Sequence, residues 1–351
     1  MKLSFPRQAA LGTVLSLILC TAVVAAPKNP AGTTDIEVHE RARGEAYMSL
    51  FDDALEKRAE LMGYRIRFFD SGQDYEVQKQ QMEVHVQPGL ALIVSSIDPK
   101  RSQELVDLCR THHNIIVFVE NEPPAGVVES YDQAWYVGGQ VDDGARKHAQ
   151  MLLDYLKAHN DYDRNHNGTL DIMLLRGPHG NSDADARSAA IEQALKKAGI
   201  AYNIADEFIG EYAYDVARNH VSEVIAAGQF PNFDIIVANS DDMALGALSA
   251  LELSSEFAHG KLNYLPILGF DGTPEAEIAI KREIMIGSML NDFHAVSRAA
   301  LNICIGNISK QELARIATEA RTASLLAKKP GVVHMHTGKG KDGYKKVLEI
   351  L

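Results

Sequence analysis

Cysteine and runs of basic residues are both scarce in this chain. Its 351 residues include only three cysteines, too few for a disulfide framework. No dense run of lysine and arginine occurs, and 47 acidic against 35 basic residues give a formal charge of −12, which argues against nucleic-acid binding. With 46% hydrophobic and 23% charged residues, the composition excludes disorder, collagen and coiled coil as the main architecture. At about 150 residues per domain, the length predicts two domains.

Motifs of common enzyme classes are also absent. The sequence has no GxSxG nucleophile elbow, no P-loop, no HExxH metal motif, and no GxGxxG fingerprint set between a predicted strand and a helix. Pairs of carboxylates leave glycoside hydrolysis as the enzymatic alternative.

The first 25 residues are predicted to form a cleavable secretion signal. Lys2 and Arg7 precede an apolar stretch at 9–24, and Val23 and Ala25 fit the −3 and −1 positions of signal peptidase. A membrane anchor is the alternative, but about 16 apolar residues fall short of the roughly 20 that span a bilayer. Lipid attachment at Cys20 is disfavoured by the bulky residue before it. Cleavage leaves 33 basic and 47 acidic residues, a charge of −14, and we expect a periplasmic protein that is not membrane-embedded.

Two cysteines remain after cleavage. Cys109 and Cys304 both lie in segments with a helical pattern, and the sequence does not say whether they meet in space. Export would permit a disulfide, yet two buried free thiols are the favoured interpretation.

Short apolar runs alternate with helical patterns along most of the chain. The runs are rich in isoleucine and valine, which is typical of buried parallel strands. Strands are expected at 64–69, 90–96, 114–119, 171–175, 202–207, 233–238, 265–269 and 284–288, and helices at 46–62, 74–86, 102–112, 142–158, 184–198, 214–227, 241–253, 274–281 and 293–307. This order predicts an α/β fold of βαβ units with parallel sheets. About eleven strands are too many for one sheet, so two lobes with helices on both faces are expected.

Polar residues cluster directly after the predicted strands. In doubly wound sheets, ligands bind beyond the carboxyl ends of the strands, so these residues are candidate ligand contacts. They are Glu120, Asn121, Asn181, Ser182, Asp183, Asn239, Ser240, Asp241, Asp242, Asp271, Asn291 and Asp292, with Arg187 nearby.

Residues 163–171 match the first half of a calcium loop. Side-chain oxygens recur at every second position and a glycine follows the third, as in the pattern D-x-[DN]-x-[DN]-G. The expected ligands are the side chains of Asp163, Asn165, Asn167 and Asp171 and the carbonyl of Thr169. The acidic residue usual at the twelfth position is missing, because Leu174 stands there. A solvated turn between helix and strand is the alternative.

Several segments resemble the periplasmic galactose/glucose-binding proteins of bacterial sugar ABC transporters. Besides the calcium loop, they are SYDQAWYVG (130–138), GPHGNSDADAR (177–187), DIIVANSDDMALGAL (234–248), ILGFDGTPEAE (267–277) and GSMLND (287–292). The resemblance covers roughly residues 46–307. It implies a type I periplasmic binding protein, with two Rossmann-like lobes of parallel sheets joined by a three-stranded hinge. Crossovers near 138–140, 291–294 and 326–331 would give a first lobe of 34–138 plus 293–326 and a second lobe of 139–292 plus 327–351.

The resemblance also implies the roles of individual residues. The family contacts sugar hydroxyls at the positions of Asp183, Arg187, Asp271 and Asn291, and it sandwiches the sugar ring at the positions of Tyr47 and Tyr214. Carboxylate, amide and guanidinium groups suit adjacent hydroxyls, and aromatic faces suit the C–H groups of a pyranose. Asp234 stands where the family supplies a further calcium ligand, so a structural Ca²⁺ is implied. Helix capping, ion pairing within a helix and core packing are the simpler roles for these residues.

Some positions depart from the family. Glu45 and Glu120 stand in place of an aspartate and an asparagine, and Asn181 and Ser240 replace a histidine and an asparagine. The first strand, at 36–44, is charged where the family is apolar, and an altered structure or a shifted alignment is expected there. Four carboxylates facing only Arg187 would have raised pKa values or select a cationic ligand. A ligand that carries an amino group is therefore one hypothesis, and acids that still reach sugar hydroxyls are the other.

The resemblance implies a periplasmic receptor for a galactose-like or glucose-like monosaccharide or a related small polar ligand. It would close its two lobes around the ligand and present it to an ABC permease, with a chemoreceptor as a further partner. The alternative is a signalling-only sensor of a non-hexose, cationic ligand that feeds a membrane sensor. An enzyme is disfavoured because the carboxylates match binding positions. A sugar-responsive repressor is disfavoured because a secretion signal replaces the DNA-binding headpiece. The protein is expected to be a monomer.

Overall fold

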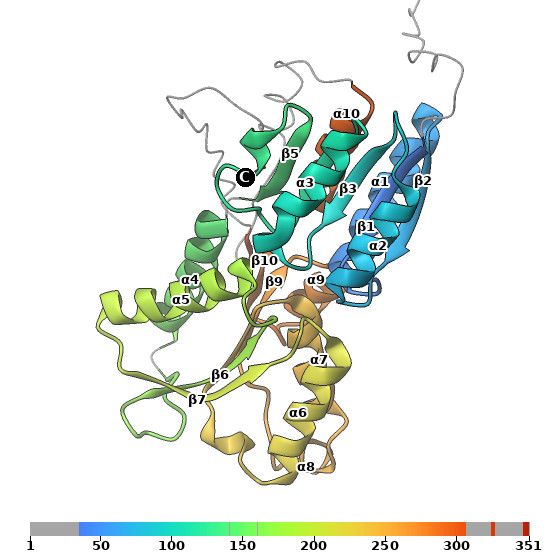
Figure 1. The fold of residues 1–351 in the computed structure, drawn as a ribbon. Coiled ribbons are helices and arrows are strands. Elements are labelled where there is room, and N and C mark those ends of the chain that lie inside the picture. The colour runs from blue at the N-terminus through green and yellow to red at the C-terminus, as the bar shows by residue number, and fades with distance from the viewer. Residues whose placement is uncertain (1–34, 140, 160, 307–323, 327–346, 351) are drawn as a thin grey trace, which may run out of the picture. The chain divides into compact units, whose positions relative to one another are not determined.

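Two α/β lobes make up the part of the chain that the structure, a computed structural model, describes: residues 35–139, 141–159, 161–306, 324–326 and 347–350 (Figure 1). The first lobe has β1 (Asp35–Glu40), α1 (Ala46–Met62), β2 (Arg65–Asp70), α2 (Tyr75–His85), β3 (Ala91–Ser95), α3 (Ser102–Thr111), β4 (Ile115–Val119) and β5 (Ala134–Gly139). The second has α4 (Val141–Ala158), β6 (Leu170–Arg176), α5 (Ser182–Ala198), β7 (Tyr202–Ile209), α6 (Tyr214–Ala226), β8 (Ile235–Ala238), α7 (Asp241–Glu252), α8 (Ser255–Ala258), β9 (Ile267–Asp271), α9 (Pro274–Lys281) and β10 (Gly287–Leu290). α10 (Phe293–Cys304), β11 (Ser324–Leu326) and β12 (Val347–Ile350) follow.

Each lobe is built on one six-stranded sheet. The strand orders are β12-β5-β4-β3-β1-β2 and β11-β10-β9-β8-β6-β7. The pairs are parallel apart from β10 with β11. The predicted fold class is therefore confirmed. In both sheets the first strand lies between the next two, so β1 and β6 hold the same place in their sheets.

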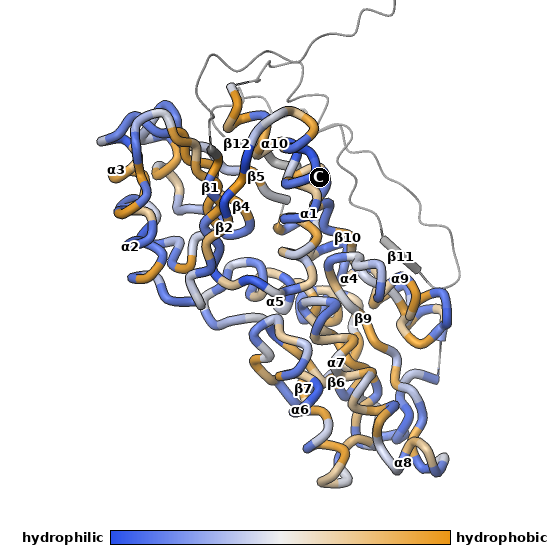
Figure 2. The backbone as a smooth tube through the Cα atoms, turned by 90° about the vertical axis from the view of Figure 1, so that its right-hand side faces the viewer, coloured by the Kyte–Doolittle hydropathy of each residue, from blue (hydrophilic) through white to orange (hydrophobic). Residues whose placement is uncertain are grey.

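Helices cover both faces of each sheet, as expected for right-handed crossovers. In the first lobe, α1 and α10 pack on one face while α2 and α3 pack on the other. In the second lobe, α4 and α5 pack on one face while α6, α7 and α9 pack on the other. Figure 2 shows how strongly hydrophobic the central strands of the second sheet are. Because the helices cover the faces of the sheets, the loops that follow the carboxyl ends of the strands are the segments that can contact a ligand.

The two terminal strands lie in the opposite sheets from those predicted. α10 packs on the first sheet, in agreement with the predicted lobe of 34–138 plus 293–326. However, β11 pairs with β10 of the second sheet, and β12 pairs with β5 of the first. The chain therefore passes between the sheets four times, after β5, after β10, before β11 and again before β12, where three crossovers were predicted. The lobe bounds were implied by the resemblance alone, and the sequence pattern predicted no strand at 324–326 or 347–350.

The charged strand β1 is an ordinary sheet strand, so the expected alteration of this lobe is wrong. Glu37, His39 and Glu40 are fully buried there. Their polar groups have ionic neighbours: Glu37 Oε1 lies 2.7 Å from Arg67 Nη2, and Glu40 Oε2 lies 3.2 Å from Arg43 Nε. Glu37 Oε2 also lies 3.2 Å from His39 Nε2. A polar strand is kept in the sheet because its side chains find partners in β2 and in the following loop.

Both remaining cysteines are free and buried, Cys109 in α3 and Cys304 in α10, which confirms the favoured interpretation. Within the described residues, the structure holds no helix with the length and apolar character to cross a membrane. The predicted secretion signal at 1–25 lies outside the described residues.

Candidate ligand-binding site

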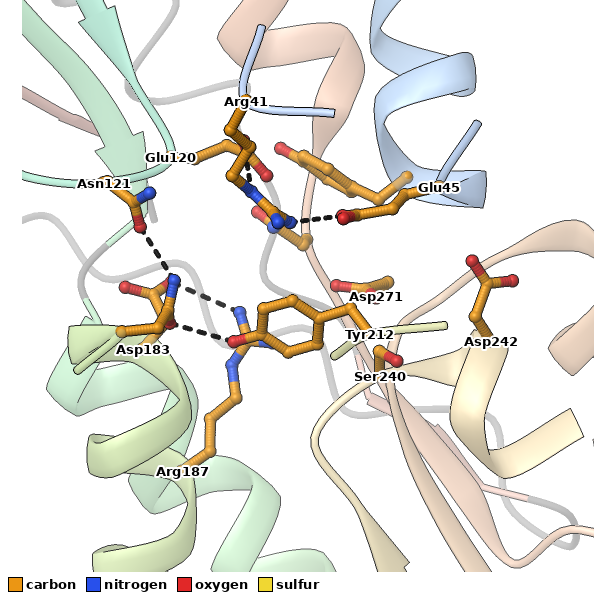
Figure 3. Close-up of a pocket in the computed structure, with 13 residues that line it drawn as sticks. Arg41, Glu45, Glu120, Asn121, Asp183, Arg187, Tyr212, Ser240, Asp242 and Asp271 are labelled. Atoms are coloured by element: carbon orange, nitrogen blue, oxygen red, sulfur yellow. Dashed lines mark hydrogen bonds and ion pairs between the residues drawn. The ribbon is translucent and has the colours of Figure 1, made fainter. Parts of the chain in front are cut away.

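A cavity of about 480 Å³ lies at the carboxyl ends of the strands, with walls from both lobes (Figure 3). A second cavity of about 650 Å³ shares several of its residues and extends along Gly138 and Gly139 at the end of β5. The first cavity is lined by Arg41, Glu45, Tyr47, Glu120, Asn121, Asn181, Asp183, Arg187, Tyr212, Ser240, Asp242, Asp271 and Asn291.

The first-lobe wall is organised by Arg41, which follows β1 directly. Its guanidinium donates to the Glu45 carboxylate, and its Nε lies 3.6 Å from Glu120 Oε2 (Figure 3). Glu120 also accepts a hydrogen bond from the Ser95 hydroxyl at the end of β3. Burial raises the pKa of Glu45 to about 8 against the opposing effect of Arg41. The Nη1 atom of Arg41 is buried without a hydrogen-bond partner among the described residues, so a ligand acceptor would satisfy it.

The second-lobe wall is organised by Arg187 on α5. Its Nη1 donates to the Asn239 carbonyl at 2.6 Å, and its Nη2 lies 3.3 Å from Asp183 Oδ2. Its Cζ lies 3.6 Å from the centre of the Phe270 ring, a cation–π contact. Burial raises the pKa of Asp183, although Arg187 opposes this. These contacts fix the guanidinium in one plane, as hydrogen bonding to adjacent ligand atoms requires.

Asp271 differs from the other acids of the pocket. It ends β9 and is only 8% exposed, and its carboxylate receives no hydrogen bond from the residues that the structure describes. Burial raises its pKa well above the ordinary value even with Arg187 nearby. Its φ is +116°, and Glu120 and Tyr212 also have positive φ, at +60° and +58°. Such strained backbone is found preferentially at functional sites.

Nine of the ten predicted ligand residues line the cavity. They are Glu45, Tyr47, Glu120, Asn181, Asp183, Arg187, Ser240, Asp271 and Asn291. They come together because each follows a strand or begins a helix at the same edge of its sheet. Their contact with a ligand stays a prediction.

Tyr214 does not line the cavity, which corrects its predicted role. It is the first residue of α6, is 36% exposed and stands beside Arg218. Tyr212 supplies the second-lobe ring instead. Its left-handed backbone turns the ring inward, and Gly177 leaves the room, since a Cβ there would lie 2.2 Å from Tyr212 Cζ.

Sequence reasoning missed two lining residues, Arg41 and Tyr212, and left two others, Asn121 and Asp242, without an assigned role. Asn121 and Asp242 were among the polar residues after strands, but the resemblance assigned them no role. Arg41 was hidden by the charged first strand, whose alignment was in doubt. Its position one residue after β1 is the signal that would have found it.

Two hydrogen bonds join the lobes on either side of the cavity. On one side, Asn181 Nδ2 donates to Asn121 Oδ1 at 2.9 Å. Asn181 is itself held within the second lobe by the Tyr212 hydroxyl, which donates to Asn181 Oδ1 at 2.9 Å. On the other side, the backbone N–H of Ala46 donates to Asp242 Oδ2 at 2.8 Å. The cavity is therefore bounded by direct contacts between the walls that would hold a ligand.

The predicted calcium residues form one hydrogen-bonded network. The Asp163 carboxylate accepts from the N–H groups of Asn167 and Gly168, at 3.1 and 2.8 Å. The Asp234 carboxylate accepts from the N–H groups of Arg164 and Asp171, both at 2.8 Å.

Asp171 completes this network. It accepts from the side-chain amides of Asn165, Asn167 and Asn203, and these bonds lower its pKa although its burial opposes the shift. No group of three His, Cys, Asp or Glu able to hold a metal occurs in the described part of the chain, so amide and carbonyl oxygens would have to complete a cation site. The oxygen-rich set fits a hard cation in its chemistry, and calcium stays a prediction.

Comparison with known proteins identifies relatives of the whole lobed structure. Residues 41–312 match the periplasmic binding protein domain. The D-galactose/methyl-galactoside binding periplasmic protein of Haemophilus influenzae is 29% identical over 248 residues, which cover 70% of this chain and 73% of that protein. The ribose import binding protein of Escherichia coli is 24% identical over 271 residues, 77% of this chain and 82% of that protein.

Solved structures share the fold. The Caulobacter myo-inositol binding protein bound to myo-inositol aligns with a TM-score of 0.64 at 18% identity, over 80% of this chain and 90% of that one. A twin-arginine translocation pathway signal protein from Burkholderia phytofirmans aligns with a TM-score of 0.66 at 20% identity, over 79% and 84%.

Proposed function

Since the chain belongs to the periplasmic binding protein domain family, we propose that it is a receptor for a monosaccharide or a related polyhydroxy compound, which it presents to an ABC permease. The observation that carries this proposal is the cavity itself, in which planar polar groups from both lobes surround a space flanked by Tyr47 and Tyr212. The curated relatives support it, because their names refer to galactose, methyl-galactoside and ribose.

The hydrogen-bonding capacity of the cavity suits hydroxyl groups. A hydroxyl both donates and accepts, so the hydroxyls of one ligand can accept from the buried Arg41 Nη1 and donate to the Asp271 carboxylate. Asp183 and Arg187 are held side by side and can contact two adjacent hydroxyls. A neutral polyol would thereby complete the polar set without adding charge to a buried site.

The second candidate function is a signalling-only sensor that binds a cationic ligand. Arg41 reduces the acidic excess that the sequence predicted, but Asp242 adds to it, so five carboxylates face two guanidinium groups across the cavity. An ammonium group would offset part of this excess. Neighbouring genes bear on the role, since a permease and an ATPase favour uptake while a sensor kinase favours signalling.

A thermal-shift screen of the mature chain separates these candidates. D-galactose, D-ribose and myo-inositol serve as neutral probes, and D-galactosamine and spermidine as cationic ones. A binder of the native state raises the melting temperature with increasing concentration. We expect a response to at least one neutral probe, abolished by Asp271→Ala and retained in Tyr214→Phe. A response confined to the cationic probes would overturn the neutral-ligand proposal.

We also propose that Ca²⁺ stabilises the loop of residues 163–171. Asp163, Asn165, Asn167, Asp171, Asp234 and the Thr169 carbonyl would hold it, and its charge would offset three carboxylates in one network. Adding calcium after treatment with a chelator should raise the melting temperature of the wild type but not of Asp163→Ala. Asp154→Ala, on exposed α4 surface, is the matched control and should respond like the wild type. Equal melting curves with calcium and with chelator would refute the site.

A further inference from the structure

Helix α1 begins without a cap of its own. Glu45 is its N-cap residue, but the Glu45 side chain makes no capping bond because it is turned toward Arg41. The first turn of α1 has no acidic residue. By contrast, α2, α5, α7, α9 and α10 each have a capping side chain at the N-cap position. The free N–H groups at the start of α1 therefore lack the partner that such helix ends usually have.

Asp242 of the second lobe supplies that partner. Its Oδ2 accepts the N–H of Ala46 at 2.8 Å, across 196 positions of sequence. Asp242 also lies in the first turn of its own helix, α7. One carboxylate thus stands at the N-termini of two helices, one in each lobe, where both helix dipoles favour a negative charge.

The bond falls between two residues of the ligand wall. Ala46 separates Glu45 from Tyr47, and both of these line the cavity. Fixing the Ala46 backbone therefore fixes the start of the helix from which these two side chains project. The bond exists only while the two lobes stand together, because its partners belong to different lobes.

We infer that Asp242 is a positioning residue: it caps α1 across the cleft and thereby couples approach of the lobes to the placement of Glu45 and Tyr47. This inference rests on the proposed function only for its ligand readout, since the cap itself can be followed without a ligand. Loss of the cap is expected to open the two lobes and to weaken ligand binding together.

The distance between the lobes gives the first test. Spin labels on Leu61→Cys at the end of α1 and Leu253→Cys after α7 report it in the mature chain, since both leucines are exposed and the two native thiols are buried. Without ligand, Asp242→Ala should shift the distance distribution toward longer values, and Asp242→Asn, which keeps an acceptor oxygen but not the charge, should shift it less. Asp215→Ala removes an exposed first-turn carboxylate from α6 and should leave the distribution unchanged.

Affinity for a probe gives the second test. With D-galactose as probe, or whichever neutral probe the wild type binds, Asp242→Ala should raise Kd about tenfold, equivalent to about 1.4 kcal/mol, and Asp215→Ala should not. A distance distribution identical in the wild type and in folded Asp242→Ala would overturn the inference. Absence of any probe binding to the wild type would instead count against the proposed function, while the distance measurement would still decide the inference.

Discussion

β1 and β6 occupy the same place in two sheets of the same topology, yet their sequences have little in common. β6 is apolar from Ile172 to Leu175, and its residues 170–175 are buried. β1 is as deeply buried but carries Glu37, His39 and Glu40. The position of a strand in the sheet therefore determines how deeply it is buried. Whether its residues can be polar depends on whether neighbouring residues compensate them.

The difference lies in how each strand offsets the cost of burial. β6 gains stability directly by removing apolar surface from water. β1 must first compensate desolvated polar groups: Arg67 of β2 pairs with Glu37, while burial raises the pKa of Glu40 so that it keeps its proton. Burial of an ion pair contributes less to the stability of the fold than burial of apolar groups of the same volume. Removing one partner leaves the other charge buried with its desolvation penalty uncompensated. The first lobe is therefore expected to depend on pH and on single charges, and the second on packing.

The largest effect is expected from truncating β6. Leu175 is fully buried in the second-lobe core, so Leu175→Ala should lower the free energy of unfolding by about 3 kcal/mol, from lost burial and the cavity left behind. Urea denaturation measures this loss. Leu61→Ala, at a leucine 87% exposed on α1, is the control and should change stability by less than about 0.5 kcal/mol. A loss below about 1 kcal/mol for Leu175→Ala would show that packing does not dominate this lobe.

A smaller effect is expected from breaking the ion pair of β1. Arg67→Ala leaves the buried Glu37 with only histidines beside it and should cost about 2 kcal/mol, below the value for fully buried pairs because Arg67 is 45% exposed. Adding Glu37→Gln should recover part of the loss in a double-mutant cycle. Lys57→Ala, which breaks an exposed pair with Asp53, should have almost no effect. Purely additive losses in the double variant would contradict the coupling.

The smallest effect concerns pH. Burial, with the neighbouring Asp52, raises the pKa of Glu40 above its ordinary 4.5, so the folded protein keeps a proton that the unfolded chain releases. Stability then falls as pH rises above about 4.5. Glu40→Gln mimics the protonated acid and should raise stability at pH 8, relative to its effect at pH 5, by at least about 1 kcal/mol. Parallel stability–pH curves for variant and wild type would show that Glu40 is charged in the fold.

Much of this architecture was predictable, because apolar periodicity reports burial directly. Most strands and helices followed from it, and the rule that ligands bind beyond strand ends selected residues such as Asp183 and Asp271 that do line one cavity. The sheets that β11 and β12 join were not predictable, because the sequence pattern predicted no strand there and the lobe bounds came from the resemblance alone. Which of Tyr212 and Tyr214 enters the cavity is decided by the backbone turn before α6, and the hydrophobic periodicity of the sequence does not reveal that turn.

The charged strand shows a different limit of sequence reasoning. Glu37, His39 and Glu40 signal exposure by composition, and their burial depends on partners such as Arg67 that lie far along the chain. The same doubt removed Arg41 from the predicted site, although it organises the first-lobe wall. Ion pairs between residues that are distant in the sequence leave no local sequence pattern. The burial of such charged residues can therefore be recognised only when the pairing of the strands is known.

The packing of α10 also bears on the order in which the lobes fold. The second-lobe core is drawn from one continuous stretch, α4 to β10, whereas the first-lobe core joins α1 to α10 across more than two hundred intervening positions. Bringing together segments so far apart in the sequence costs conformational entropy before their contacts can stabilise the lobe. Contacts between distant parts of a chain therefore slow folding. During synthesis or refolding, the backbone amides of the second lobe should therefore be protected from hydrogen exchange first. The first lobe should remain susceptible to proteases until α10 has packed against its sheet.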